Sequence, residues 1–545
     1  ASALQSEDLP LGRTSLGGGY WVLAVLCGLA MAEAVRGWST RAWLSLLGSV
    51  VFVAPVVALV WNGQLDALSL MKEYDNRRDV FDAALQRHLL LVGATLLPTL
   101  LIGVPLGVLA SRRPKMQPAL LSALNLLQTV PSIALFALLM VPLAALASRW
   151  PVLTHWGISG IGVAPAVTAL TLYSLLPTVR STMAGLDQIA PGVLEAARGM
   201  GMTRRQLFWQ VEVPLAWPVW LAGLRVTTVQ ALGLAMVSAL IGGGGGVPGT
   251  AEQRRGPRAA GGGAGGGAGG GGGCAVQGAR AMDDAGSAMI EFQQVGKSFG
   301  GQAVVEDVSL TIAPGEFVVL IGRSGSGKST TLKMVNRLVE HDRGRILFAG
   351  QEIRSFQPED LRRRMGYAIQ STGLFPHWTV ERNIACVPTL LKWPAARIRD
   401  RVTELLELLQ LPPDLYRGRY PNALSGGQQQ RVGVARALAA DPDVLLMDEP
   451  FGALDPITRA ALQTELARIH RLSGKTIVLV THDIDEALRL GNRIVLLDHG
   501  RIVQVGTPRQ LLAEPANDFV RDFIGRSDTG LRLLALDTVA SRLRR

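Results

Sequence analysis

The chain has 545 residues, several times the length of an ordinary domain, so we expect at least two domains. Charge is unevenly distributed: residues 1–249 hold 16 Lys and Arg and 11 Asp and Glu, whereas residues 289–545 hold 34 and 29. The first part is too apolar for a soluble domain, and the second has an ordinary globular balance. These values exclude a single soluble enzyme, a coiled coil and a wholly disordered chain.

The net charge of +11 forms no basic tail and no dense stripe of Lys and Arg. We therefore expect no nucleic-acid partner. The three cysteines, Cys27, Cys274 and Cys386, lie far apart and match no metal-binding spacing. A disulfide framework is thereby excluded in practice.

Six apolar stretches in the first 241 residues are candidate membrane-spanning helices, because a span needs roughly 20 mostly apolar residues. They are Gly19–Val35, Ala42–Trp61, Leu89–Ala110, Ala119–Ala147, Val163–Leu176 and Val213–Ile241. The fourth stretch carries Pro131 and Pro142, which predict a kink or a break there. Residues 1–241 are thus expected to form an all-α, multi-pass transmembrane domain surrounded by lipid.

The loops between these stretches alternate in their content of Lys and Arg. Arg36–Arg41, Ser111–Lys115 and Arg198–Arg205 are basic and are expected in the cytoplasm, whereas residues 62–88 and 148–160 fit the outside. This pattern places the N-terminus outside, and it also places residue 242 outside.

Residues 195–214, which read E-A-A-R-G-M-G-M-T-R-R-Q-L-F-W-Q-V-E-V-P, predict two short helices joined by a turn. Leu194 and Ala197 give the first an apolar face, Gly201 makes the turn, and the second carries Leu207. The segment resembles the cytoplasmic coupling loop of ABC importer permeases, which implies that it docks in a groove on an ATPase. The residues that carry this resemblance are Glu195, Ala196, Ala197 and Gly201. The alternative is an ordinary basic loop.

Residues 242–288 separate the two halves, and more than half of residues 242–273 are glycine. Such a composition normally indicates a flexible linker.

A new pattern begins at Met289. Residues 290–299 and 304–312 alternate as strands, and Phe317–Ile321 is a continuous apolar run typical of a buried strand. A glycine-rich loop of the form G-x-x-x-x-G-K-S follows, and then a predicted helix from Thr330 to Val339. In such a loop the backbone N–H groups and the lysine bind phosphates, and the serine binds Mg²⁺. The predicted ATP-binding residues here are Gly322, Ser324, Gly325, Gly327, Lys328, Ser329 and Thr330.

Val444–Met447 is a second buried apolar run, and it ends at Asp448-Glu449-Pro450. We expect Asp448 to hold Mg²⁺ and Glu449 to accept a proton from the attacking water. For these three residues alone the alternative is a surface turn. Together with the phosphate-binding loop they predict a nucleoside triphosphatase that uses ATP and Mg²⁺.

Residues 424–431 read L-S-G-G-Q-Q-Q-R and resemble the signature sequence of ABC transporter ATPases. The resemblance covers about residues 289–525, and it implies an α/β P-loop ABC ATPase domain over residues 289–545. In that family the signature touches the γ-phosphate of the ATP bound to a partner. The matching positions are Ser425, Gly426, Gly427 and Gln428. A dimer with a second copy, or with a second ABC cassette, is therefore expected.

The same resemblance implies roles for four further residues. Phe299 would stack on adenine, and Asp455 would lie at the dimer interface. Gln370 would sense Mg²⁺ and water, and His482 would contact the γ-phosphate and position the attacking water. The predicted catalytic residues are Glu449, His482 and Gln370. The predicted metal-binding residues are Ser329, Gln370 and Asp448.

Taken as a whole, the chain resembles the permease and the ATPase of a binding-protein-dependent ABC importer joined in one polypeptide. Residues 126–132 (L-L-Q-T-V-P-S), 332–338 (L-K-M-V-N-R-L) and 370–377 (Q-S-T-G-L-F-P-H) resemble osmoprotectant uptake systems. This resemblance implies ATP-driven uptake of glycine betaine, choline or a related quaternary ammonium compound across the bacterial plasma membrane, with an extracytoplasmic substrate-binding protein. The alternatives are an ABC importer of another small solute, such as an amino acid, and a non-transport ABC ATPase. The resembled ATPases often carry C-terminal regulatory modules, and we expect none after Gly525.

The predicted topology conflicts with a cytoplasmic ATPase. Residue 242 is expected outside, yet residues 242–288 contain no apolar run long enough to return the chain across a membrane. Either one predicted span is wrong, or a reading-frame shift has joined two polypeptides here. In the second case Met289 or Met282 would be an original start.

Overall fold

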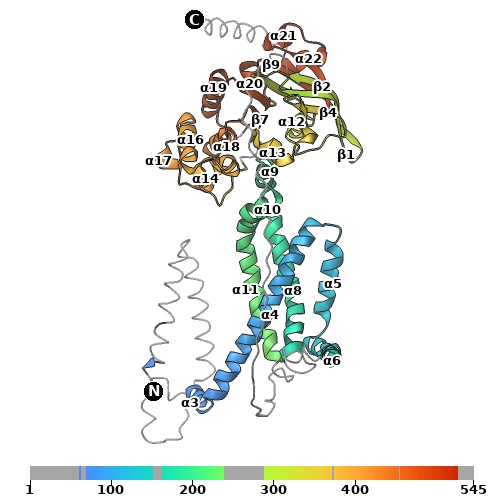
Figure 1. Ribbon diagram of the computed structural model, residues 1–545, viewed down its shortest axis with the longest axis vertical. Coiled ribbons are helices and arrows are strands. Elements are labelled where there is room, and N and C mark those ends of the chain that lie inside the picture. The colour runs from blue at the N-terminus through green and yellow to red at the C-terminus, as the bar shows by residue number, and fades with distance from the viewer. Residues whose placement is uncertain are drawn as a thin grey trace, which may run out of the picture. The chain divides into compact units, whose positions relative to one another are not determined.

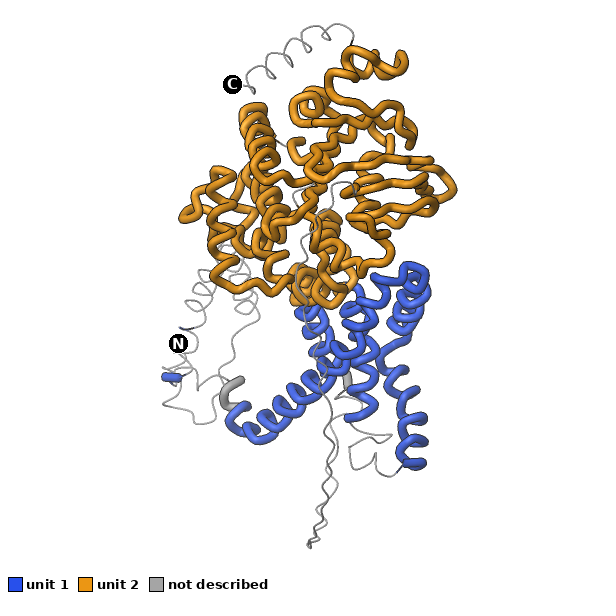
Figure 2. Tube along the Cα trace, turned by 45° about the horizontal axis from the view of Figure 1, so that its top comes forward, with its two compact units in different colours: residues 1–180, 222–253 blue, residues 181–221, 254–545 orange. Residues whose placement is uncertain are grey.

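In the computed structural model the chain forms two compact units, one within residues 1–180 and 222–253 and the other within residues 181–221 and 254–545 (Figure 2). The structure describes residues 54, 61–62, 69–150, 163–238, 288–370, 373–452 and 454–525. The candidate spans near Gly19–Val35 and Ala42–Trp61 lie almost entirely outside the described residues, as does the segment 242–288.

The described part of the first unit is helical throughout. Its helices are α3 (Ser69–Asn76), α4 (Arg78–Arg112), α5 (Gln117–Thr129), α6 (Ser132–Arg149), most of α8 (Val163–Asp187) and most of α11 (Val213–Ser238). The break predicted in the fourth apolar stretch lies between α5 and α6, where Val130 is extended, because the residue before a proline avoids the helical conformation. Pro142 stays inside α6.

Three described helical stretches are long and apolar enough to cross a membrane, namely Arg78–Arg112, Ser132–Arg149 and Arg204–Met236. The first differs from its prediction, because α4 begins at Arg78 and not near Leu89. Part of the expected outer loop is therefore helical. Glu73 and Arg77, one turn apart, form an ion pair of 3.0 Å that stabilises this region.

The core of the first unit is built from α4, α6, α8 and α11. Ala169 and Leu170 of α8 are fully buried, with Phe136 of α6 and Ala231 of α11 in the same cluster. By contrast, many large apolar side chains remain exposed, such as Leu101 of α4 and Leu138 and Val141 of α6. Apolar surface on every side of a helix is typical of a membrane-spanning helix, so the predicted all-α class holds for this unit.

The second unit contains a mostly parallel sheet and a smaller antiparallel sheet. The six-stranded sheet has the order β10-β9-β3-β8-β7-β6, in which β9, β3, β8, β7 and β6 run parallel and β10 is antiparallel to β9. The four-stranded sheet has the order β2-β1-β4-β5 and is antiparallel. The strands are β1 (Ile290–Phe299), β2 (Gln302–Ile312), β3 (Phe317–Gly322), β4 (Arg343–Phe348), β5 (Gln351–Glu352), β6 (Met365–Ala368), β7 (Val444–Asp448), β8 (Thr476–Val480), β9 (Arg493–Asp498) and β10 (Arg501–Gly506).

Helices surround the strands of this unit. Figure 1 shows α14, α16 and α17 gathered on one side, away from β1, β2 and β4. The helices are α9 (Pro191–Gly199), α10 (Arg204–Leu207), the π-helix η1 (Phe208–Glu212), α12 (Lys328–Val335), η3 (Ile353–Ser355), α13 (Pro358–Arg363), α14 (Val380–Ile384), α15 (Cys386–Leu390), α16 (Ala395–Leu408), α17 (Pro413–Tyr416), η4 (Pro421–Ala423), α18 (Gly426–Leu438), α19 (Pro456–Ser473), α20 (Ile484–Leu490), α21 (Pro508–Ala513) and α22 (Asp518–Ile524).

The central strands explain why the sheet forms. Every residue of β3, β7 and β8 is buried, as expected for continuous apolar runs in a parallel sheet covered on both faces. The strands predicted at residues 290–299, 317–321 and 444–447 are confirmed to within one residue. One predicted helix was too long, because α12 ends at Val335 and Arg337 has a positive φ of 53°.

The segment 195–214 folds as predicted, with α9, a turn, then α10 and the π-helix η1. Gly201 makes the turn with φ of 75°. Thr203 caps α10 through a capping box with Gln206, which fixes where the second helix begins. This segment belongs to the second unit, together with the strands.

Candidate functional site

The phosphate-binding loop follows β3 and opens directly into α12. Gly327 stands at the N-cap of α12 with φ of 92°, and a side chain there would lie 2.6 Å from the carbonyl oxygen of Val304. Only glycine fits this position. The Lys328 ammonium lies inside the loop and donates to the carbonyl oxygens of Gly322, at 2.8 Å, and Arg323, at 2.7 Å. Burial lowers the pKa of Lys328, and the carboxylates of Glu449 and Asp448 oppose that shift.

Two carboxylates stand at the carboxyl end of β7, facing this loop. The Ser329 hydroxyl donates to Asp448 Oδ1 at 2.8 Å, which joins α12 to β7. Asp448 is 2% exposed, and burial raises its pKa although the Ser329 hydrogen bond acts in the opposite direction. Glu449 has a positive φ of 47°, and its backbone N–H donates to Val480 on the neighbouring strand β8. The backbone thus turns sharply where the second carboxylate begins.

Glu449 is held by the two other residues predicted to be catalytic. Gln370 Nε2 donates to Glu449 Oε2 at 2.9 Å, and His482 Nδ1 lies 3.3 Å from Glu449 Oε1. The three residues follow β6, β7 and β8, which are parallel neighbours, so their carboxyl ends meet at one edge of the sheet. A carboxylate oriented through both oxygens can accept a proton from a water molecule.

The donor set beside the loop suits a small, hard cation. Ser329 and Asp448 provide oxygen atoms, and the Gln370 amide keeps its oxygen available because its nitrogen donates to Glu449. Gln370 and Asp448 also line one cavity of about 340 Å³. No group of three or more His, Cys, Asp or Glu side chains suited to a metal occurs among the described residues. One carboxylate, one hydroxyl and one amide oxygen suit Mg²⁺, which is usually held by few carboxylates together with waters and substrate phosphates.

The residue predicted to stack on adenine lies at the end of β1. The Phe299 ring is 50% exposed, and Lys297 Nζ lies 5.1 Å from its centre. The ring is therefore open to a planar ligand.

The signature residues begin α18 and form their own local network. Ser425 caps the helix in a capping box with Gln428, and Gln428 Nε2 also donates to the Tyr416 hydroxyl at 3.0 Å. Asp455 similarly caps α19 by accepting from the Thr458 N–H at 3.0 Å, and the Thr458 side chain, followed by this N–H, lowers the Asp455 pKa. Ser425 and Gly426 are exposed, so the helix N-terminus is open to an anion. These hydrogen bonds do not involve the Glu449 group.

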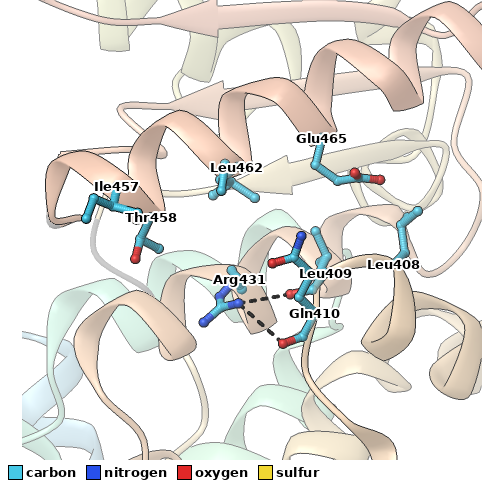
Figure 3. Close-up of a pocket in the computed structure, with 9 residues that line it drawn as sticks. Leu408, Leu409, Gln410, Arg431, Ile457, Thr458, Leu462 and Glu465 are labelled. Atoms are coloured by element: carbon cyan, nitrogen blue, oxygen red, sulfur yellow. Dashed lines mark hydrogen bonds between the residues drawn. The ribbon is translucent and has the colours of Figure 1, made fainter.

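A cavity of about 150 Å³ lies between α16, α18 and α19 (Figure 3). Arg431 of α18 donates there to the carbonyl oxygens of Leu409, at 3.2 Å, and Gln410, at 3.4 Å. Ile457 of α19 lines the cavity and is 84% exposed. None of the predicted ATP-binding residues lines it, so this cavity is distinct from the predicted nucleotide site.

The predicted coupling segment contacts the ATPase fold within the second unit. Glu195 of α9 forms an ion pair of 2.9 Å with Lys333 of α12 and accepts a hydrogen bond of 2.7 Å from the Tyr367 hydroxyl. Arg363 Nε donates to the carbonyl oxygen of Gly201 at 3.2 Å. We call the surface formed by Lys333, Arg363, Tyr367 and His377 the coupling seat.

The last contact of the coupling seat is made to the π-helix η1. His377 Nε2 lies 2.8 Å from the carbonyl oxygen of Gln210. Ala196 and Ala197 are 2% and 0% exposed, so both predicted alanines are buried in this contact region.

Sequence reasoning did not predict the residues of the coupling seat. Lys333 and His377 lie in two of the runs quoted for their resemblance, but nothing in those runs assigned them a contact. Arg363 and Tyr367 carried no signal. Their partners are more than 130 residues away in the chain, so no local spacing links them.

Family models match three parts of the chain. The model described as ABC transporter matches residues 305–452. The model of the binding-protein-dependent transport system inner membrane component matches residues 103–257. The model of the N-terminal domain of the ABC transporter permease YehY matches residues 1–71.

Two curated proteins and one solved structure illustrate what the chain is similar to. The glycine betaine uptake system ATP-binding protein YehX of Escherichia coli is 68% identical over 257 residues, which are 47% of this chain and 83% of that protein. The glycine betaine/carnitine/choline transport ATP-binding protein OpuCA of Bacillus subtilis is 55% identical over 239 residues, and the chain spans less than two thirds of its length, 63%. A dimeric ATP-binding cassette solved with ADP and Pi is 33% identical, with a TM-score of 0.38 over 40% of this chain and 99% of that one.

Proposed function

The chain belongs to the ABC transporter family and is an ATP hydrolase coupled to transport, and we propose that it imports a small osmoprotectant. The proposed solutes are glycine betaine, choline and related quaternary ammonium compounds. The proposal rests on a contact between the coupling segment and the ATP site. Glu195 of the coupling segment pairs with Lys333 of α12, the helix that follows the phosphate-binding loop. The names of the similar proteins from Escherichia coli and Bacillus subtilis support the solute class.

Hydrolysis is proposed to use the residues gathered at the carboxyl ends of the parallel strands. Lys328 binds the β- and γ-phosphates of ATP, and Glu449 takes the proton of the attacking water. Gln370 and His482 orient Glu449 through its two oxygens. Mg²⁺, held by Ser329, Asp448 and Gln370, would neutralise charge on the phosphates when bound.

A second cassette is proposed to complete each ATP site. The exposed N-terminus of α18, with Ser425 and Gly427, would face the γ-phosphate bound to the partner, and Asp455 would lie at the interface. ATP must bind the closed pair better than the open pair, because a ligand shifts an equilibrium only through its differential affinity. The coupling segments would carry this motion to the spans.

The domain division is also a proposal. Residues 1–241 form the multi-pass permease in the bacterial plasma membrane, residues 289–545 form the cytoplasmic cassette, and residues 242–288 form a glycine-rich linker or a frame-shifted segment. An extracytoplasmic binding protein delivers the solute, in keeping with the permease family matched at residues 103–257. Sequencing the coding DNA across the linker tests the frame shift, and an uninterrupted frame with a stable full-length product would contradict it.

The solute class is tested by uptake into vesicles. The full chain is reconstituted with its binding protein on the substrate side and ATP on the cassette side. Labelled glycine betaine, choline and methionine are then compared at equal concentration. ATP-dependent accumulation of glycine betaine or choline, with little methionine, is expected. Accumulation of methionine alone would replace the osmoprotectant with an amino acid as the solute.

A further inference from the structure

Tyr367 stands at the centre of the coupling seat. It lies in β6, is 3% exposed, and donates its hydroxyl hydrogen to Glu195 Oε1 at 2.7 Å. Burial, and then the adjacent Glu195 carboxylate, raise the pKa of Tyr367, so the phenol keeps its proton and remains a donor. Glu195 is thereby held from two sides, by Tyr367 and by the Lys333 ammonium.

The ring of Tyr367 also lies against the backbone of the same helix. Gly199 follows Glu195 by four residues, so the two occupy one face of α9. A Cβ atom at Gly199 would collide with Tyr367 Cδ1 and lie 3.0 Å from Cε1. The ring belongs to a buried strand residue paired with Leu446 of β7, so it cannot move aside freely. The position therefore requires a residue with no side chain.

The two secondary-structure elements that hold Glu195 lead directly to the ATP site. Lys333 lies on α12, which begins at the phosphate-binding Lys328. Tyr367 lies on β6, three residues before Gln370, which donates to Glu449. A change in how α9 is held can therefore reach both the phosphate loop and the general base through short, stiff segments.

We propose that Tyr367 is the specificity-determining residue of the coupling seat: it accepts only a coupling helix that has a carboxylate at position 195 and no side chain one turn later, at position 199. This inference rests on the proposed function, because it takes residues 195–214 to be the coupling segment. The hydroxyl recognises the carboxylate, and the ring recognises the missing side chain. Neither Glu195 nor Gly199 is sufficient without the other.

The test separates the two parts of the tyrosine side chain. Tyr367→Phe removes only the hydroxyl, Gly199→Ala introduces the collision, and the double variant Gly199→Ala with Tyr367→Val removes the colliding ring atoms. Gly93→Ala is the control, because it adds a methyl group to a helical glycine with no heavy atom within 4 Å. The full chain is used throughout, and solute taken up per ATP hydrolysed is measured together with ATP affinity.

We expect Tyr367→Phe to lower uptake per ATP by about tenfold, as for a lost hydrogen bond to a charged group. Gly199→Ala should lower it by at least about tenfold through overpacking. The double variant should recover to the level of Tyr367→Val alone, and ATP affinity should stay unchanged in all of them. Normal coupling in Gly199→Ala, or a double variant worse than both single variants, would overturn the proposal.

A second measurement does not depend on the solute. Hydrogen exchange of α9 in the full chain should accelerate in Gly199→Ala and return towards the rate of Tyr367→Val in the double variant. That pattern in a protein that transports no osmoprotectant would reject the proposed solute and support the role of Tyr367. Unchanged exchange in Gly199→Ala, in a protein that does transport osmoprotectant, would reject the role of Tyr367 and leave the proposed function intact.

Discussion

The ATP site and the coupling seat lie in the same unit but are assembled in different ways. The ATP site gathers short contiguous motifs at the ends of neighbouring parallel strands, so each motif places several functional groups at once. The coupling seat is made of single pairs, such as Glu195 with Lys333 and with Tyr367, whose members are 138 and 172 residues apart. The groups proposed to hydrolyse ATP therefore lie in motifs that the sequence displays, whereas the contacts proposed to transmit motion join single residues that belong to no motif assigned to that role.

The two regions also differ in burial and charge. Asp448 and Lys328 are almost completely buried, at 2% and 6% exposed, while the side chains of Glu195 and Lys333 are 31% and 27% exposed. An ion pair that is open to solvent contributes less free energy than an interaction between charges that are buried away from water. Changes at the ATP site should therefore abolish the reaction, and changes at the coupling seat should weaken its coupling to transport.

The largest expected effect is that of Glu449→Gln. The amide cannot accept the proton of the attacking water, so hydrolysis should fall by about 10²- to 10⁴-fold. ATP binding should persist, because Gln keeps the size of the side chain and the phosphate loop is untouched. The measurements are single-turnover hydrolysis and retention of labelled ATP. Near-normal hydrolysis would remove Glu449 from its role as base.

Lys328→Ala should lower the affinity for ATP. The ammonium lies inside the phosphate loop, and losing a charged donor there should weaken ATP binding by roughly ten- to a hundredfold. Equilibrium binding of ATP to the full chain measures this change. The control is Lys475→Ala, a lysine that pairs with Asp441 at 2.9 Å outside the loop. Equal losses of affinity in the two variants would contradict the assignment.

A smaller effect, confined to coupling, is expected for Glu195→Gln. This variant loses the ion pair with Lys333 and the charged acceptor of the Tyr367 hydrogen bond, so uptake per ATP should fall by about tenfold, as for Tyr367→Phe. Hydrolysis itself should change little, since no hydrogen bond of Glu449 is altered. Uptake and phosphate release measured in the same vesicles give the ratio directly. A parallel fall in hydrolysis would show that the coupling seat and the ATP site are not separable.

The smallest effect is a pH dependence of the coupling seat through His377. Burial lowers the pKa of His377, with the hydrogen bond to Gln210 opposing this and Arg382 adding to it. His377 in this environment therefore binds protons less well than a solvent-exposed imidazole. Its contribution to stability is fully present above the ordinary pKa of 6.5 and declines as the pH falls below that value towards the lowered pKa.

At pH 6.5 this loss is at most about 0.4 kcal/mol, which is at most about twofold in the docked fraction. Uptake per ATP should be compared at pH 7.5 and pH 6.5 for the wild type and for His377→Gln, which keeps a donor but does not titrate. The pH dependence should shrink in the variant. An identical profile would show that another group is responsible.

Much of the candidate ATP site could be predicted from the sequence because its groups lie in short motifs. Buried apolar runs identified β3 and β7, which end at the glycine-rich loop and at Asp448 and Glu449, whereas Gln370 and His482 were assigned through the resemblance to ABC transporter ATPases. The structure brings Gln370 and His482 each within hydrogen-bonding distance of Glu449. The same reasoning predicted the break near Pro131 and the turn at Gly201 from backbone chemistry.

The coupling seat could not be predicted in this way. Tyr367 sits in a strand whose sequence gives no sign of a function, and its partner Glu195 lies on a helix in a different half of the chain. The ends of α4 and α12 were also misplaced, because α4 begins eleven residues before the apolar run and the backbone turns at Arg337. Such features depend on tertiary contacts and on the local conformation of the backbone. Neither can be read from the spacing of apolar residues in the sequence.

The most direct test of the account compares the wild type with Glu449→Gln in vesicles that contain the full chain, its binding protein and ATP. Accumulation of labelled glycine betaine or choline is measured over time in both. The account predicts accumulation against the concentration gradient by the wild type and none by the variant, although the variant still binds ATP. Equal accumulation by both proteins would contradict the claim that hydrolysis at Glu449 drives uptake.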